Sequence, residues 1–159
     1  MRAQRRKHTG RRLIALGAAG LLASLFMTWS HQFSPALLAR FGSSALLRGV
    51  PHDPTAWQVY SVADVLLALL ALGLVALAAR AGGRSARIGA TLAAVLALAF
   101  AFHALSKPPT NGATAVDASR SVPSYFPDSP GAGDGETVAI VALGFAVAGL
   151  GLSFTADRF

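Results

Sequence analysis

The chain contains no cysteine, and only 13% of its 159 residues are charged. The absence of cysteine excludes disulfide bonds, thiolate metal ligands and cysteine nucleophiles. The charged fraction is well below the ~25% of soluble domains, while 53% of the residues are hydrophobic. This composition is too apolar for an ordinary soluble domain, so the sequence predicts an integral membrane protein.

Acidic residues are also scarce: seven Asp and Glu stand against fourteen Lys and Arg, which gives a net charge of +7. Such an excess can indicate nucleic-acid binding, but here the cations cluster along the chain. Six lie in residues 1–12, and three more follow the second apolar run. Clustering beside apolar runs is typical of the positive-inside rule. We therefore expect a lipid bilayer and no nucleic acid as partner, with the following topology determinants: Arg11, Arg12, Arg80, Arg84 and Arg87.

Four apolar runs lie at about 13–29, 57–79, 88–106 and 137–156. Runs of this length can cross a ~30 Å hydrocarbon core as helices. The sequence thus predicts an all-α fold, a four-transmembrane-helix bundle over residues 13–156. A basic tail, 1–12, precedes it and a short tail, 157–159, follows it. Residues 80–87 form an inner turn, and residues 30–56 and 107–136 form two outer loops.

The first run resembles the apolar part of a secretory signal peptide, which is ~7–15 residues long and ends in small residues. Here the run is longer and ends in the bulky Phe26, Met27 and Trp29. We therefore predict an uncleaved first helix, preceded by arginines that set topology rather than by a twin-arginine signal. With residues 1–12 inside, ten Lys and Arg lie inside and four outside. This bias predicts a multi-pass protein of the cell membrane with both termini cytoplasmic.

Aromatic residues make up only 8% of the chain, and some stand at the predicted membrane surfaces. Amphipathic rings favour the headgroup region, so we interpret Trp29, Trp57 and Tyr60 as interfacial anchors. All eight prolines fall in the two outer loops. The pattern therefore predicts uninterrupted helices and argues against transporters built on broken helices.

The two outer loops differ in composition. Ser34 and Pro35 before residues 36–48, with Gly49 after them, are typical of helix punctuation and favour a short interfacial helix. The second loop carries five prolines and four glycines. We expect it to be extended, with solvated acids.

Small residues recur at four-residue spacing in three of the runs, a pattern typical of close helix packing. The spacing fits packing within one bundle and also a seam between copies. The positions are Ala15, Ala19 and Ala23; Gly89, Ala93, Ala97 and Ala101; and Gly144 with Ala148 and Gly149 with Ser153.

Asp64 is the one acid inside an apolar run. With Trp57 at the interface, Asp64 lies about 10 Å deeper at 1.5 Å per residue. An unpaired carboxylate at that depth is costly, so Asp64 should face the bundle interior. Ser24, Ser61 and His103 fall at similar depth. The sequence predicts that these four residues form a polar collar, which either fixes helix packing or binds a proton or cation.

No phosphate-binding glycine loop, HExxH or GxSxG motif occurs, so we expect no enzyme activity and no cofactor. The one other constellation open to acid-base or metal chemistry comprises His31, His52, Asp53 and His103. These residues lie on three separate segments without an i, i+4 pair. We therefore interpret them as surface or interfacial side chains and predict no metal site.

One pattern resembles a known family. Ser24, Leu25, Phe26 and Trp29 end the first run, and Ala56, Trp57, Ser61 and Asp64 begin the second. This arrangement is similar to that of small uncharacterised four-span integral membrane proteins of actinobacteria. The resemblance covers about a quarter of the chain and implies the topology, but no activity.

Two functions remain open. The first is a non-enzymatic accessory or scaffold protein of the cell envelope, which binds a membrane-protein partner or a second copy. The second is a small transporter or channel subunit that uses Asp64 as a proton or cation site.

Overall fold

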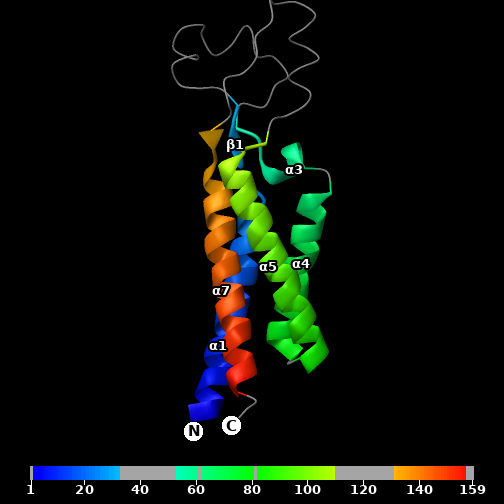
Figure 1. Cartoon of the computed structure of the whole chain (residues 1–159), viewed down its shortest axis with the longest axis vertical. Helices are drawn as coiled ribbons and strands as arrows, with labels where there is room; N and C mark the ends of the chain where they lie inside the picture. The colour runs from blue at the N-terminus through cyan, green and yellow to red at the C-terminus, as the bar shows by residue number, and fades with distance from the viewer. Residues whose placement is uncertain (1, 33–52, 61, 81, 110–130, 157–159) are drawn as a thin grey trace, which may run out of the picture.

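The structure is a computed structural model, and it describes residues 2–32, 53–60, 62–80, 82–109 and 131–156. Within these ranges, four long helices alternate in direction along one axis (Figure 1). Helix α1 packs against α7 and α4, and α5 packs against the same two helices. The long helices are α1 (Arg2–Ser24), α4 (Ala63–Arg80), α5 (Arg84–Ser106) and α7 (Asp134–Ala156).

Three short elements lie at one end of the bundle, where α1 ends and α4 and α7 begin (Figure 1). We call it the loop end. Strands β1 (Ser30–His31) and β2 (Gly131–Ala132) pair antiparallel there, and α3 (Ala56–Val59) is a single helical turn. The opposite end, which holds the turn between α4 and α5 and the start of α1, is called the basic end.

Three of the helices are long and apolar enough to cross a membrane: α4, α5 and residues 134–155 of α7. The prediction of an all-α membrane bundle is confirmed to this extent. Helix α1 is not among the three, because Lys7, Arg11 and Arg12 occupy its first half.

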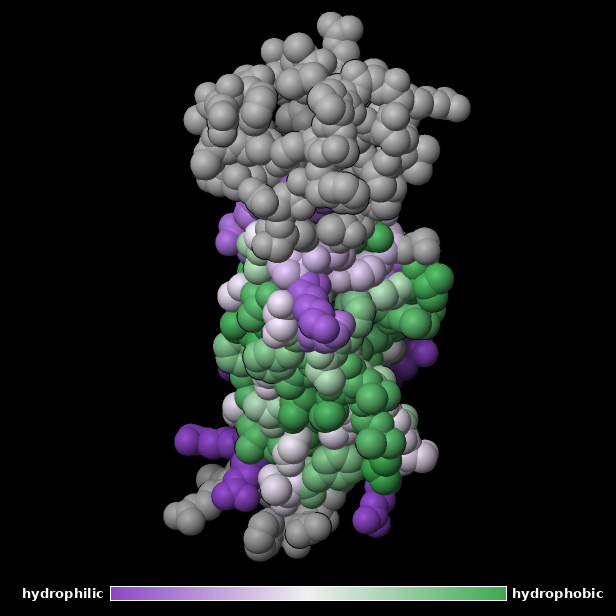
Figure 2. All heavy atoms as spheres, turned by 45° about the horizontal axis from the view of Figure 1, so that its top comes forward, coloured by the Kyte–Doolittle hydropathy of each residue, from purple (hydrophilic) through white to green (hydrophobic). Residues whose placement is uncertain are grey.

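Helix α5 turns small residues toward the bundle interior and large apolar residues outward. Helix α5 buries Ala94, Ala97, Ala101 and Ala104, while Leu96 on the same helix is 71% exposed. Figure 2 shows apolar residues covering the middle of one face, with hydrophilic residues gathered toward its two ends. Small residues let helix backbones approach, and an apolar exterior suits a lipid solvent.

The predicted limits of the first helix need correction. Helix α1 begins at Arg2, inside the expected tail, and ends at Ser24 rather than at Trp29. After Ser24 the backbone tightens into a turn, in which the Met27 N–H donates to the Ser24 carbonyl at 3.1 Å. The Trp29 N–H then donates to the carbonyl of Pro54 at 2.9 Å, so tertiary contacts replace the helix.

The second predicted helix, 57–79, is interrupted. Helix α3 ends at Val59, Tyr60 is extended with φ −113° and ψ 133°, and α4 starts at Ala63. The prediction of uninterrupted helices is therefore wrong here, although no proline is present. The break turns Tyr60 toward the bundle, where its ring packs edge-on against Phe100 at 5.2 Å between centroids.

The third and fourth helices begin earlier than the apolar runs. Helix α5 starts at Arg84 and α7 at Asp134, because the flanking polar residues continue the helices. The predicted interfacial helix at 36–48 lies outside the described residues.

Helices α1 and α7 meet through glycine. A Cβ added at Gly17 would lie 2.5 Å from the Ala142 carbonyl oxygen, and one at Gly149 would lie 2.6 Å from the Gly10 carbonyl oxygen. The predicted stripe of Ala15, Ala19 and Ala23 is instead exposed. Close packing thus uses a different face of α1, because glycine permits a nearer backbone approach than alanine.

The other small-residue positions divide between the core and the surface. On α5, Ala97 and Ala101 are buried, while Gly89 and Ala93 are exposed. On α7, Gly144 and Ala148 are exposed and Ser153 is half-buried.

Candidate functional site: the loop end of the bundle

The extended segment Thr28–Gln32 holds the loop end together. The backbone N–H of Trp29 donates to Pro54, and its carbonyl accepts from the Gly133 N–H at 3.2 Å. The Gly135 N–H donates to the Thr28 carbonyl at 2.8 Å. The segment therefore bonds to the chain preceding α3 on one side and to the chain leading into α7 on the other.

The side chain of Trp29 fills the centre of this end. It is fully buried, and its indole N–H donates to the Ser24 carbonyl at 2.7 Å. Its ring meets the edge of Tyr60 at 5.8 Å between centroids and lies 6.4 Å from Phe100. The interpretation of Trp29 as an interfacial anchor is wrong, because a ring with no exposed surface cannot reach lipid headgroups.

The other two expected anchors differ from Trp29 in exposure. Trp57 is 41% exposed and lies 6.0 Å from the Phe26 ring, so it is free to face an interface. Tyr60 is half-buried in the aromatic cluster described above. Trp57 therefore remains suited to the headgroup region, while Tyr60 packs against the rings of Trp29 and Phe100.

Two glycines allow α7 to start against this tryptophan. A Cβ on Gly135 would lie 2.5 Å from Cδ1 of Trp29, and a Cβ on Gly133 would collide with the Thr28 carbonyl. A side chain at either position would force the chain leading into α7 away from Trp29.

Two of the four residues predicted to form a polar collar are buried, and each of the two bonds to its own helix. Ser24 is fully buried and Asp64 is 2% exposed, and both lie at the loop end. The Ser24 hydroxyl donates to the Leu21 carbonyl, and the Asp64 carboxylate accepts from the Val65 N–H at 2.8 Å. His103 does not join them, because its side chain is exposed on α5. Ser61 lies outside the described residues.

A second buried acid, Glu136, was missed in the sequence. It lies in the first turn of α7 with no exposed surface, and neither carboxylate oxygen has a hydrogen-bond partner among the described residues. The expectation that acids of the second outer loop are solvated is wrong for this residue. A signal existed, since acids favour the first turn of a helix and Glu136 directly precedes an apolar run.

Tyr60 lies close enough to Glu136 to sense its charge. Burial, with a smaller contribution from the Glu136 charge, raises the pKa of Tyr60 to about 12. The phenol is therefore neutral at physiological pH and can donate a hydrogen bond.

One of the outer histidines, His31, pairs with an acidic side chain, Asp53. Nδ1 of His31 lies 2.7 Å from Oδ1 of Asp53, and both side chains are about half exposed. His52 lies outside the described residues. In the part of the chain that the structure describes, no three His, Asp or Glu side chains gather closely enough to hold a metal ion.

The expected topology determinants lie toward the basic end. Arg11, Arg12, Arg80 and Arg84 are exposed. Arg87 has a structural contact as well: its Nη1 donates to the Ser153 carbonyl at 3.2 Å, and its guanidinium lies 5.5 Å from the centroid of the Phe154 ring. Arg87 thereby links α5 to the end of α7.

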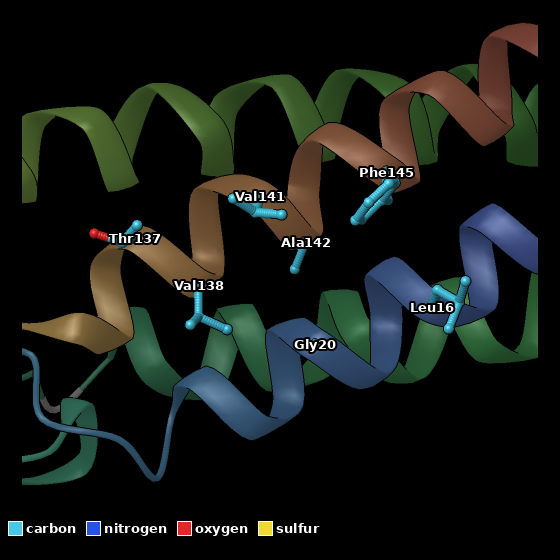
Figure 3. A pocket seen from close by; sticks show the side chains of 7 residues that line it. All are labelled: Leu16, Gly20, Thr137, Val138, Val141, Ala142 and Phe145. Carbon is cyan, nitrogen blue, oxygen red and sulfur yellow. The ribbon is translucent and has the colours of Figure 1, made fainter.

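A separate cavity of about 300 Å³ opens between α1 and α7 (Figure 3). Thr137 supplies its one polar side chain, so the cavity offers no set of groups for acid-base or metal chemistry. The lining residues are Leu16, Gly20, Thr137, Val138, Val141, Ala142 and Phe145.

No protein-family model, curated protein or solved structure matches this chain. The function must therefore be argued from the geometry of the loop end and the membrane character of the helices.

Proposed function

We propose that this chain is a four-span integral membrane protein of the cell envelope and acts as a non-enzymatic accessory or scaffold protein. It presents two outer connections, residues 33–52 and 110–130, to a membrane-protein partner. One observation carries the proposal: the chain ends that border both connections meet at one place. Gln32 Nε2 donates to the Pro109 carbonyl at 3.0 Å, and His31 contacts Asp53 and pairs with Gly131.

This shared base suits presentation better than catalysis. Gln32 is 1% exposed and also donates to the Ser30 hydroxyl at 2.6 Å, so a buried side chain holds this junction. Buried polar networks whose members are paired rigidify a structure. A fixed base holds the described ends of both connections in place, and restraint of this kind lowers the entropy cost of binding a partner.

Helix α1 serves as the fourth span. Ile14, Ala18 and Leu21 are buried in the core, and Gly17 meets the backbone of α7 near its middle. Since α7 is long and apolar enough to cross the bilayer, a helix in such contact lies at the same depth. The long side chains of Arg11 and Arg12 reach the interface by snorkelling.

The basic end lies on the cytoplasmic side of the cell membrane, and so do both termini. The support is the positive-inside rule, because the basic residues of α1 and those around the turn between α4 and α5 share this end. The loop end and both connections then face outward.

The test is site-specific crosslinking in native membranes. A photo-crosslinking amino acid at Ser43 or at Ser119, one in each connection, should capture the same partner in stoichiometric amount after purification in mild detergent. Gln32→Leu should reduce capture, because it removes the hydrogen bonds that the Gln32 amide donates to Ser30 and Pro109. Gln4→Leu is the matched control, since Gln4 is exposed near the basic end.

Two results would contradict the accessory role. One is the absence of any stoichiometric partner from both positions. The other is equal capture by the Gln32→Leu and Gln4→Leu variants, which would mean that the shared base has no part in presentation.

A small transporter or channel subunit is the second candidate, and the burial of Asp64 favours it. Ionisable residues inside membrane segments often mark ion or proton paths. Substrate-dependent proton or cation flux in proteoliposomes that contain this protein alone would support transport against the accessory role.

A further inference from the structure

Glu136 is a buried acid whose carboxylate has no hydrogen-bond partner among the described residues. Both carboxylate oxygens are shielded from solvent and lack a hydrogen-bond partner among the described residues. The nearby Gly133 N–H does not serve as a partner, because it donates its hydrogen bond to the Trp29 carbonyl at 3.2 Å. No Lys or Arg side chain of the described residues forms an ion pair with it.

An ionised carboxylate is poorly suited to this position. Burying an unpaired ion costs more free energy than burying a neutral polar group without a partner. This difference in free energy favours the binding of a cation to the carboxylate. The residues around the carboxylate decide which cation can bind.

A metal ion or an organic cation fits poorly. Oxygen-liganded cations such as calcium take six to eight oxygen ligands, and no group of three candidate ligands exists among the described residues. The rings of Trp29, Tyr60 and Phe100 pack against one another at 5.2–6.4 Å between centroids, which leaves no open aromatic cage. Glu136 does not line the cavity between α1 and α7. A proton is the cation that needs no space.

We propose that Glu136 is a proton-binding site at the loop end, which holds a proton at neutral pH while its carboxyl group is buried. The reaction is a simple acid-base equilibrium: the carboxyl group loses a proton to water and becomes a carboxylate. This inference goes beyond the accessory role and does not depend on it.

The other ionisable groups at this end do not compete for that role. Tyr60 is neutral in the physiological range, and Asp64 accepts a hydrogen bond from its own helix. His31 pairs with Asp53 away from the core. Among the residues that the structure describes, the other ionisable groups at the loop end are exposed: Asp134 on α7, and His103 and Lys107 at the end of α5.

The sequence makes a direct test feasible, because Glu136 is the only glutamate in the chain. Cell-free synthesis with glutamate carrying ¹³C at the side-chain carboxyl group labels that one acid in the wild-type protein. The purified protein in lipid bilayers is then titrated, and the ¹³C carboxyl resonance and infrared carbonyl band are followed. We expect a protonated carboxyl signal that persists up to neutral pH, where an exposed glutamate would be ionised, and that disappears reversibly as the pH is raised further.

Two variants complete the test. Glu136→Gln should remove the labelled carboxyl signals, whereas Asp134→Asn, which changes an exposed acid in the same helical turn, should leave them unchanged. A labelled group that is already ionised at pH 7 in the wild-type protein overturns the proposal. This result does not depend on whether the Glu136→Gln variant folds, and it leaves the accessory role untouched.

Discussion

Trp29 donates its indole N–H to the carbonyl oxygen of Ser24, the last residue of α1, at 2.7 Å. The bond closes the chain on itself within five residues of the helix end. It also satisfies the one polar atom of a ring that otherwise packs against Tyr60, Phe100 and Gly135 in the first turn of α7.

The first prediction concerns that bond. Trp29→Phe should lower the free energy of unfolding by about 1–3 kcal/mol, because it removes a buried hydrogen bond and leaves space beside Tyr60. Unfolding in mild detergent, by heat or denaturant, measures the change. Trp57→Phe, the same substitution at a 41% exposed site, should stay within about 0.5 kcal/mol. Equal losses for the two variants would contradict a central role for Trp29.

The second prediction concerns the contact between α1 and α7. Gly17→Ala places a methyl group 2.5 Å from the Ala142 carbonyl oxygen and 2.7 Å from the Ala146 nitrogen. Because both are backbone atoms, the helices must separate, and we expect a loss of about 1–3 kcal/mol in unfolding free energy. Gly144→Ala is the control, since nothing lies within 4 Å of its added Cβ. That variant should be neutral or more stable by roughly 0.5–1 kcal/mol.

The third prediction concerns the pKa of Tyr60, which is raised to about 12. The chain has two tyrosines, so Tyr125→Phe leaves Tyr60 as the only tyrosinate signal in an ultraviolet pH titration. Adding Glu136→Gln should lower the pKa, because a negative charge disfavours ionisation of the phenol. The pKa should stay above the ordinary value, since burial is the larger cause. Asp134→Asn should not change it, and a rise with Glu136→Gln would refute the assigned contact.

Apolar run length was enough to predict the membrane helices, because a run that crosses the bilayer must be both long and uncharged. Helices α4, α5 and α7 lie within a few residues of the predicted spans. The predicted first and last residues of the helices were wrong where tertiary contacts override the local sequence pattern. Nothing near Tyr60 signals a helix break, since the break depends on rings contributed by Trp29 and Phe100.

The same holds for the candidate site: the position of a residue along its helix could be predicted, but the direction of its side chain could not. Depth along a helix correctly grouped Ser24 and Asp64 at one end, but depth does not give the direction in which a side chain points. His103 is exposed for that reason. Glu136 was assigned to solvent because glycines and prolines precede it. In the structure Gly133 and Gly135, which flank Asp134 next to Glu136, pack against Thr28 and Trp29, about a hundred residues away in the chain.

The fourth prediction concerns orientation. The chain lacks cysteine, so single cysteines can be probed with an impermeant thiol reagent. Ser43→Cys and Ser119→Cys should react in intact cells whose outer barrier, if any, has been opened. Ser85→Cys, at an exposed position near the turn between α4 and α5, should react only after the membrane is permeabilised. The reverse pattern would invert the topology.

The last prediction separates packing from transport at Asp64. Asp64→Asn keeps a side-chain oxygen that can accept the Val65 N–H, so we expect folding to be unchanged. Asp64→Ala removes this acceptor and should cost about 0.5–1.5 kcal/mol in unfolding free energy. If Asp64 only orders the start of α4, the Asp64→Asn variant should also keep the wild-type cellular phenotype, because the charge is not needed. Flux that is present in wild-type proteoliposomes and lost in a folded Asp64→Asn variant would instead identify the titratable carboxyl group as part of an ion path, and the accessory role would fail.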